Sequence, residues 1–339
     1  MRILIIGGTR FIGPAVVARL HGMGHDVTVF HRGESETELP SAVRHIHGNR
    51  QRLADFAEEF RSVIPDVVLD MGAFTQEDAR EVIDAFRGIA RRLVTLSSQD
   101  VYRAYGRFHG SEPDSLEPVP YTEEALLREK LYPYRGTGRN LDDYEKILVE
   151  RSVGSSLLLP ATVLRLPMVY GEQDYQRRIS LELRRMDDSR PAILLEERFA
   201  RWRWTRGYVG NVAAAIALAV SDPRAAGRVY NVGEADSLMY ADWVRAIGRV
   251  AGWTGEVVVV PDGLLPPKLR PPAGDYSQHL IADTGRMRRE LGFVEPVPRD
   301  EALRRTIEWE RAQRSHGDPK PLDYEAEDAV LAELATGAT

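Results

Sequence analysis

The sequence contains no cysteine, and this absence limits the chemistry that the chain can perform. Disulfide bonds, thiolate nucleophiles and cysteine metal ligands are all excluded. A long block of one charge sign is also missing, because 45 basic and 51 acidic residues give a net charge of −6 without clustering. A nucleic-acid-binding surface is usually basic, so we do not expect nucleic acid as a partner.

Long hydrophobic runs are missing as well. The longest apolar run, Val212 to Val220, is much shorter than the roughly 20 residues that span a bilayer. A predicted strand begins at Arg2, which leaves no room for a signal peptide. We therefore expect a soluble, cytoplasmic protein without a membrane segment.

The start of the chain follows the pattern of a dinucleotide-binding βαβ unit. A predicted strand, Arg2–Ile6, is followed by a glycine turn, Gly7–Gly13, then by a predicted helix and a second strand, Asp26–His31. Gly7 allows a sharp turn after the strand, and Gly13 allows the helix to lie close to the sheet. The start of the helix offers backbone N–H groups and a positive dipole to a pyrophosphate. We therefore favour a nicotinamide-type cofactor over a plain tight turn.

Short apolar runs alternate with helical patterns through the first half of the chain. We expect strands at Arg2–Ile6, Asp26–His31, Val43–His47, Asp66–Asp70, Arg92–Ser97 and Thr162–Leu166. We expect helices at Phe11–Met23, Arg52–Arg61, Gln76–Phe86 and Leu141–Ser152. Strands separated by helices form a parallel sheet covered on both faces, with ligands at the carboxyl ends of the strands. The predicted fold class is α/β, a Rossmann-type doubly wound parallel sheet.

The second half of the chain has a different pattern, which we interpret as a smaller C-terminal α/β substrate domain. We expect helices at Arg177–Met186, Val209–Val220, Tyr240–Ala251 and Asp300–Arg314, with short strands near Val229–Val232 and Glu256–Val260. The predicted division is a dinucleotide-binding domain at 1–175 with a returning segment near 205–235, a substrate-binding domain at 176–320, and a charged tail at 321–339.

The end of the second predicted strand bears on the choice of nucleotide. An acidic side chain at this point would bind the ribose 2′-hydroxyl of NAD, but His31 and Arg32 stand there instead. Arg32, with Arg10 of the glycine turn, can hold a 2′-phosphate through charge-assisted hydrogen bonds. The alternative is that Arg32 is a solvated turn residue. We expect NADP(H) to be favoured over NAD(H).

Seven segments match one known family in the same order along the chain. They are Gly7–Gly13, Ser97–Tyr102, Lys146–Glu150, Leu164–Gly171, Gly207–Ala213, Val229–Gly233 and Glu290–Phe293. On these motifs the chain resembles the extended short-chain dehydrogenase/reductase family, of the NAD-dependent epimerase/dehydratase type that often acts on nucleotide sugars. Arg10 replaces the middle glycine of the family's turn, and this form resembles an atypical branch that includes plastid stem-loop RNA-binding proteins.

The resemblance implies roles for individual residues. Ser98 is expected to hydrogen-bond the reacting oxygen, and Lys146 to hold the nicotinamide ribose and lower the pKa of a catalytic tyrosine. The other residues expected around the cofactor are Gly7, Thr9, Arg10, Phe11, Ile12, Gly13, His31, Arg32, Asn49, Arg50, Met71, Gly72, Pro167 and Val169. The residues expected around the substrate are Gln99, Tyr134 and Arg206. For Arg206 the alternative is an exposed arginine on a packed aromatic strand.

The position of the catalytic tyrosine departs from the family pattern. The family places it four residues before the lysine, where both side chains share one helix face, but here that residue is Asp142. Tyr144 lies only two positions before Lys146, about 200° away on a regular helix. Three alternatives remain: the helix starts or bulges here and Tyr144 serves, Tyr134 reaches in from its loop, or no catalytic tyrosine exists. We predict Tyr144.

The histidines suggest a metal site only weakly. His45 and His47 lie two residues apart and therefore on one face of a predicted strand. No third ligand is evident from the sequence, so we expect no metal.

The leading hypothesis is an NAD(P)-dependent epimerase, dehydratase or reductase that transfers hydride on a sugar or nucleotide-sugar-like substrate. One alternative is a non-catalytic, NADP(H)-binding regulatory protein, which the displaced tyrosine motivates. Another is an RNA-binding protein of the atypical branch, which the net charge opposes. The family also implies a homodimer through the predicted helices Gln76–Phe86 and Leu141–Ser152.

Overall fold

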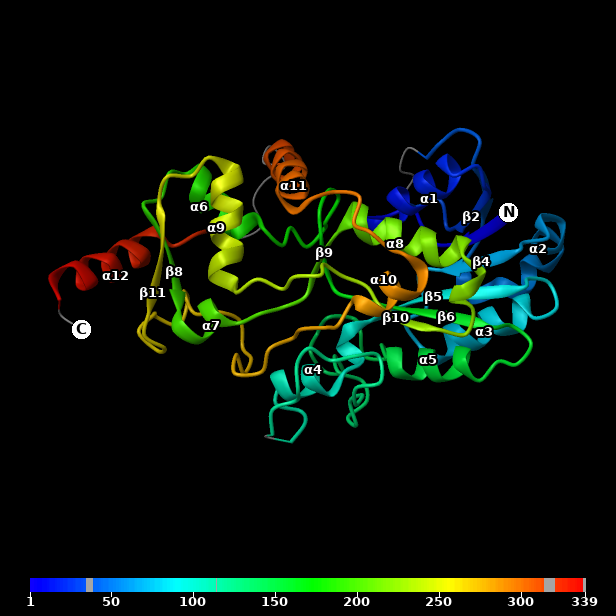
Figure 1. The fold of residues 1–339 in the computed structure, drawn as a ribbon, viewed down its shortest axis with the longest axis horizontal. Coiled ribbons are helices and arrows are strands. Elements are labelled where there is room, and N and C mark those ends of the chain that lie inside the picture. Colours follow the sequence, from blue (N-terminus) through cyan, green and yellow to red (C-terminus); the bar gives the residue numbers. More distant parts are fainter. Residues whose placement is uncertain (35–38, 114, 314–320, 338–339) are drawn as a thin grey trace.

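A seven-stranded sheet forms one end of the molecule, and a smaller group of helices and strands forms the other (Figure 1). The computed structural model describes residues 1–34, 39–113, 115–313 and 321–337. The sheet order is β10-β6-β5-β4-β1-β2-β3, and every pairing is parallel. Its strands are β1 (Arg2–Ile6), β2 (Asp26–His31), β3 (Arg44–His47), β4 (Val67–Asp70), β5 (Arg92–Ser98), β6 (Ala161–Leu166) and β10 (Val229–Asn231). The predicted Rossmann-type α/β fold is confirmed.

Alternation of side chains along the buried strands explains why helices cover both faces of this sheet. Ile3 and Ile5 of β1 belong to a core shared with α1 (Ile12–Gly22) and α8 (Val209–Ser221). Leu4 and Ile6 point to the opposite face. The elements on that face are the 3-10 helix η1 (Arg50–Phe56), α2 (Ala57–Val63), α3 (Gln76–Phe86) and α5 (Lys146–Gly154). Strands buried on both faces must be apolar throughout, which is why these segments read as continuous hydrophobic runs.

Helix α3 begins at a capping box. The Thr75 hydroxyl accepts a hydrogen bond from the Asp78 backbone N–H at 3.1 Å, and the Asp78 carboxylate accepts one from the Thr75 N–H at 2.9 Å. The helix then packs beside α5. The homodimer through this helix pair stays a prediction.

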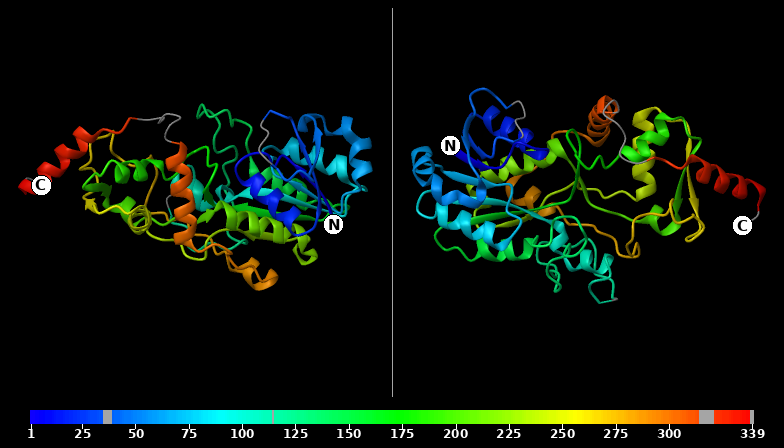
Figure 2. Two further views of the ribbon diagram at one scale, coloured as in Figure 1. Left: turned by 90° about the horizontal axis from the view of Figure 1, so that it is seen from above. Right: turned by 180° about the vertical axis from the view of Figure 1, so that it is seen from behind.

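The C-terminal part is built around two short parallel strand pairs. The pairs are β8 (Ala192–Glu196) with β11 (Glu256–Val260), and β7 (Met168–Tyr170) with β9 (Arg206–Tyr208). The helices of this part are α6 (Ser180–Asp187), α7 (Glu197–Arg201), α9 (Tyr240–Ala251), α11 (Arg299–Gln313) and α12 (Tyr324–Thr336). Helix α10 (Gly285–Leu291) instead packs beside β10 at the sheet end (Figure 1). The N-terminus lies at the sheet end and the C-terminus at the far end of an elongated molecule (Figure 2).

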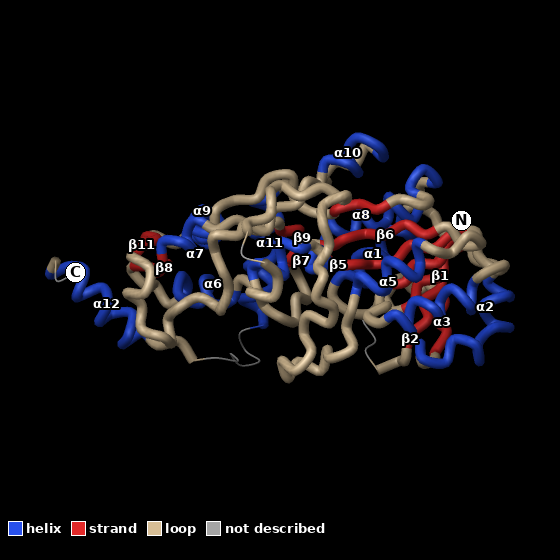
Figure 3. Tube along the Cα trace, turned by 90° about the horizontal axis from the view of Figure 1, so that it is seen from below, coloured by secondary structure: helices blue, strands red, loops and turns tan. Residues whose placement is uncertain are grey.

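Long loops connect the sheet to the C-terminal part, as Figure 3 shows. The segment after β5 contains the short helices η2 (Gln99–Val101) and α4 (Arg103–Phe108). Between α4 and α5 the described residues form no further helix or named strand. A third 3-10 turn, η3 (Pro223–Ala225), precedes β10. Among the described residues, no helix combines the length and the hydrophobicity needed to pass through a bilayer.

Several predicted elements differ from the structure. In place of one helix at Arg52–Arg61, the chain forms η1 and then α2, because the backbone is non-helical at Arg52, with φ −139° and ψ 38°. The helix expected at Leu141–Ser152 begins only at Lys146, because the Glu145 carboxylate caps it by accepting a hydrogen bond from the Ile147 N–H at 2.9 Å. The expected tail contains helix α12, which is held by the buried Val330 and by a 2.7 Å ion pair between Glu327 and Arg185. Arg314, the predicted end of the preceding helix, lies outside the described residues.

Candidate active site

The glycine turn between β1 and α1 has the backbone geometry that its sequence suggests. Gly7 and Gly8 have φ values of +89° and +88°, which side chains other than glycine rarely tolerate. A Cβ on Gly13 would lie only 2.3 Å from the carbonyl carbon of Gly8, so helix and turn are in direct backbone contact. The N-cap residue Phe11 makes no side-chain cap to the first turn of α1. This cradle fits a pyrophosphate bound at the start of the helix.

Gly13→Ala is expected to weaken nucleotide binding at least tenfold, because the new methyl group pushes the Gly8 backbone out of the cradle. Titration calorimetry with NADPH and NADH measures the effect. Gly22→Ala is the matched control in the same helix, since a Cβ there would meet none of the described atoms within 4 Å. Equal affinities of the two variants would contradict this role of the turn.

A cavity of about 840 Å³ lies at the carboxyl ends of β1, β2, β4 and β5. Its volume is within the range of sites for small molecules and cofactors, and its position is where doubly wound sheets bind ligands. Most of the predicted cofactor and catalytic residues line it: Gly7, Thr9, Arg10, Phe11, Ile12, His31, Arg32, Asn49, Arg50, Met71, Gly72, Ser98, Tyr144 and Lys146. The structure thus brings together the glycine turn and the Ser98–Tyr144–Lys146 group.

The late start of α5 allows Tyr144 and Lys146 to face the same cavity. Tyr144 precedes the helix, so the angle of about 200° that a regular helix would impose between the two side chains does not apply. The Lys146 ammonium lies 5.9 Å from the centre of the Tyr144 ring. The structure therefore has the first of the three alternatives: the helix starts after Tyr144, and Tyr144 lines the cavity.

Behind Tyr144 lies the buried carboxylate of Asp100, which belongs to the Ser97–Tyr102 motif but is not among the residues predicted for the site. The Tyr144 and Tyr134 hydroxyls each donate a hydrogen bond of 2.9 Å to Oδ2 of Asp100. Burial raises the pKa of Asp100 above its ordinary value, although Arg128 and the two phenols oppose this shift. A carboxylate with a raised pKa is a better proton acceptor than an ordinary aspartate.

The pKa of Tyr144 differs in direction from our expectation. Burial raises it well above the ordinary value of 10, and the nearby Asp100 and Tyr134 raise it further, whereas Ser98 works against the shift. The phenol therefore keeps its proton, which it donates to Asp100. Tyr144 alone is not set up here as a phenolate base.

Lys146 is buried beneath the cavity floor. Its Nζ donates hydrogen bonds to the backbone carbonyls of Ala73 and Leu96, at 2.5 and 2.8 Å. Burial lowers the pKa of Lys146 to about 8, partly offset by the carboxylates of Asp70 and Asp100. The two carbonyl groups thus hold the Lys146 ammonium at the floor of the site.

Two arginines that line the cavity form ion pairs with carboxylates. Arg32 forms a solvent-exposed ion pair with Glu34 at 3.1 Å. Arg50 is held by Asp70 at 2.8 Å and by Asp78 at 3.2 Å. Arg50 is thereby fixed as part of the cavity wall, with its charge already balanced.

Six predicted site residues do not line this cavity: Gly13, Tyr134, Gln99, Pro167, Val169 and Arg206. Gly13 acts through the backbone contact described above. Arg206 is buried, not exposed, with its guanidinium 4.6 Å from the centre of the Trp243 ring. Gln99 is also buried and donates a 2.9 Å hydrogen bond to the Val232 carbonyl. Their cofactor and substrate roles stay predictions.

The expectation that no third ligand accompanies His45 and His47 is wrong. His31, at the end of β2, stands beside His45 and His47 of β3, so a third imidazole is present. Only the pairing register of two strands brings it there, which the sequence alone does not show.

A parallel sheet with a glycine-rich first turn and a cavity at its carboxyl edge defines a Rossmann-like nucleotide-binding protein. The model of the NAD dependent epimerase/dehydratase family matches residues 3–233. The chain belongs to this family, and a nicotinamide nucleotide cofactor follows from the membership.

Several proteins resemble the chain in sequence. The 2′-dehydrokanamycin reductase of Streptomyces kanamyceticus is 24% identical over 268 residues, covering 77% of this chain and 70% of the relative. The dTDP-glucose 4,6-dehydratase of Streptomyces niveus is 27% identical over 351 residues, covering 96% of this chain and 97% of the relative. The chloroplast stem-loop binding protein of 41 kDa b of Arabidopsis thaliana is 30% identical over 149 residues, covering 40% of this chain and 39% of the relative.

Solved structures show the same fold. The UDP-glucose 4-epimerase of Thermotoga maritima, solved with UDP-glucose, superposes with a TM-score of 0.69 at 18% identity, covering 93% of this chain and all of that one. The likeness includes the C-terminal part as well as the sheet.

Proposed function

We propose that the chain is an NAD(P)-dependent epimerase, dehydratase or reductase that acts on a sugar or nucleotide-sugar-like substrate. One observation carries the proposal: Ser98, Tyr144 and Lys146 line the same cavity as the glycine turn. The names of the relatives, a dehydratase of a nucleotide sugar and a reductase, support the substrate class.

The proposed chemistry moves one proton through two residues. When bound, the nicotinamide ring supplies the hydride acceptor. The Ser98 hydroxyl orients the substrate hydroxyl, and the Tyr144 oxygen accepts its proton. Tyr144 passes its own phenolic proton to Oδ2 of Asp100, along the 2.9 Å hydrogen bond that already joins them. The raised pKa of Asp100 favours this transfer, and no free phenolate is needed.

Lys146 is proposed to hold the nicotinamide ribose and to supply positive charge. Its two carbonyl partners fix the ammonium beneath Tyr144 and Phe74, 4.9 Å from the centre of the Phe74 ring. A positive charge here stabilises the negative charge that develops on the substrate oxygen as its proton leaves.

A panel of UDP- and dTDP-sugars tests the proposed function. We expect at least one compound to be turned over, with a change in NAD(P)H absorbance for a reductase, or with product found by mass spectrometry or NMR for a redox-neutral epimerase or dehydratase. Tight cofactor binding with no turnover across sugars and other carbonyl compounds would instead favour the non-catalytic regulatory protein. Salt-sensitive RNA binding without cofactor uptake would favour the RNA-binding alternative.

We further propose NADP(H) as the preferred cofactor. Arg32 lies at the mouth of the cavity and β2 ends without an acid. NADPH is expected to bind more tightly than NADH, and Arg32→Ala to weaken NADPH binding about tenfold while leaving NADH unchanged. Arg52→Ala is the control, because Arg52 is another exposed arginine paired with an acid, Asp55, but it does not line the cavity. Tighter binding of NADH by the unaltered protein would reject the preference.

A further inference from the structure

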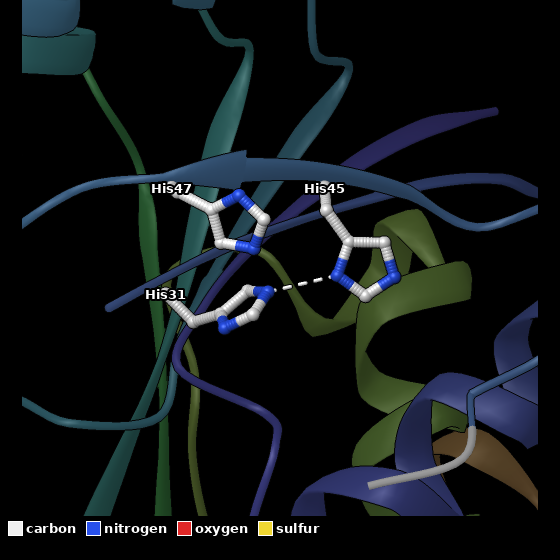
Figure 4. Close-up of side chains that lie close together, drawn as sticks. All are labelled: His31, His45 and His47. Carbon is white, nitrogen blue, oxygen red and sulfur yellow. Dashed lines mark hydrogen bonds between the residues drawn. The ribbon is translucent and has the colours of Figure 1, made fainter. Parts of the chain in front are cut away.

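Three imidazole rings gather at the edge of the sheet (Figure 4). One of them, His31, also lines the nucleotide cavity. The register of β2 and β3 places His31 opposite His47, and His45 shares the face of His47 because it lies two residues earlier on the same strand. The ring of His31 is 5.0 Å from that of His45 and 4.7 Å from that of His47, measured between ring centres. His31 is buried, while His45 and His47 are exposed.

The nitrogen atoms are spaced closely enough for one ion. One nitrogen from each ring lies within 4.8 Å of the others, and Nε2 of His31 is 2.8 Å from Nδ1 of His45. At a Zn–N distance of about 2.05 Å, the nitrogens around a tetrahedral ion are about 3.3 Å apart. Rotation of the two exposed rings provides the small adjustment that this distance requires.

We propose that His31, His45 and His47 bind a divalent transition-metal ion such as Zn²⁺. Three neutral imidazoles suit Zn²⁺, Co²⁺, Ni²⁺ or Cu²⁺, whereas Mg²⁺ and Ca²⁺ prefer oxygen ligands. Three protein ligands leave a fourth coordination position for water or for an anionic ligand.

Ion binding rearranges one proton. Nδ1 of His31 accepts a hydrogen bond from the Gly33 backbone N–H at 3.2 Å, so the neutral ring carries its proton on Nε2 and donates it to His45. Coordination through Nε2 moves this proton to Nδ1, without a net release of protons. The Gly33 N–H, which belongs to a residue that lines the nucleotide cavity, then loses its acceptor.

Calorimetric titration of the nucleotide-free protein, prepared without a histidine tag, with ZnCl₂ tests the site directly. We expect one Zn²⁺ per chain. His45→Ala and His47→Ala should each weaken binding at least tenfold, and both variants should fold normally because the two side chains are exposed. His109→Ala is the control, since this exposed histidine lies outside the cluster, and it should leave the affinity unchanged.

Co²⁺ provides a second readout that does not depend on enzyme activity. Binding at a four-coordinate site with three imidazole nitrogens should produce visible d–d absorption, which His45→Ala should remove. The absence of stoichiometric Zn²⁺ binding, or equal binding by the unaltered protein and both cluster variants, would overturn the proposal. Neither result would bear on the proposed hydride transfer, because neither experiment uses nucleotide or sugar.

Discussion

Tyr144→Phe is expected to lower kcat by about 10²–10⁴-fold, the range usually contributed by a general acid–base group. The substitution removes the hydroxyl that bridges the cavity and Asp100, so the substrate proton loses its route. It leaves the aromatic ring in place, and therefore KM for the cofactor should change little. Steady-state kinetics with a substrate from the sugar panel, together with single-turnover hydride transfer, measure the effect.

Tyr134→Phe is the matched control for this variant. It removes a hydroxyl that donates to the same Oδ2 of Asp100 at the same 2.9 Å distance, but Tyr134 does not line the cavity. We expect a smaller loss of kcat than for Tyr144→Phe, because the Tyr134 hydroxyl supports Asp100 without facing the substrate proton. If Tyr134→Phe were the more damaging of the two, the catalytic tyrosine would come from the loop; if neither mattered, the chain would use none.

Arg128→Ala is expected to lower the free energy of unfolding by about 3–5 kcal/mol, because it leaves the Glu145 carboxylate unpaired in the interior. The two side chains are 2% and 0% exposed and lie 3.2 Å apart. Glu145 also accepts hydrogen bonds from the backbone N–H groups of Ile147 and Tyr132. The ion pair thus secures the start of α5, which positions Tyr144 and Lys146. Urea titration followed by circular dichroism gives the loss of stability.

A second arginine of the same region provides the comparison. Arg135 pairs with Asp143 at 3.5 Å, but the side chains are 55% and 83% exposed, so Arg135→Ala should cost less than about 1 kcal/mol. Should Arg128→Ala prove too unstable to purify, the double variant Arg128→Met with Glu145→Gln is expected to recover part of the loss. If the two single variants lost the same free energy of unfolding, burial would not strengthen the contribution of the Arg128–Glu145 pair.

The sheet and the nucleotide cradle could be predicted because their signals are local. Apolar runs define the strands, and the spacing of Gly7 and Gly13 defines the turn whatever follows later in the chain. Helix α9 was predicted with the bounds that the structure has, since its apolar residues repeat with helical spacing and Gly252 ends it in the left-handed conformation.

The other features depend on contacts between distant residues. The start of α5 is fixed by Glu145, whose partner Arg128 lies in a loop without regular pattern. Arg206 is drawn into the interior by Trp243, more than thirty residues later. The third histidine depends on how β2 and β3 align. None of these contacts leaves a mark in the neighbouring sequence, which is why the candidate site was predicted only in part.

The order of strands in the sheet also has a consequence during synthesis on the ribosome. Strand β6 ends at Leu166, but its neighbour β10 begins only at Val229. Helix α8, which packs beside α1 on one face of the sheet, is made between them. At a translation rate of about 5–20 residues per second, roughly 3–12 s separate the two strands. For that time β6 is an unpaired border of the nascent sheet, and α1 alone covers the face that α8 later shares. Both the border and the uncovered apolar surface can associate with other newly made chains.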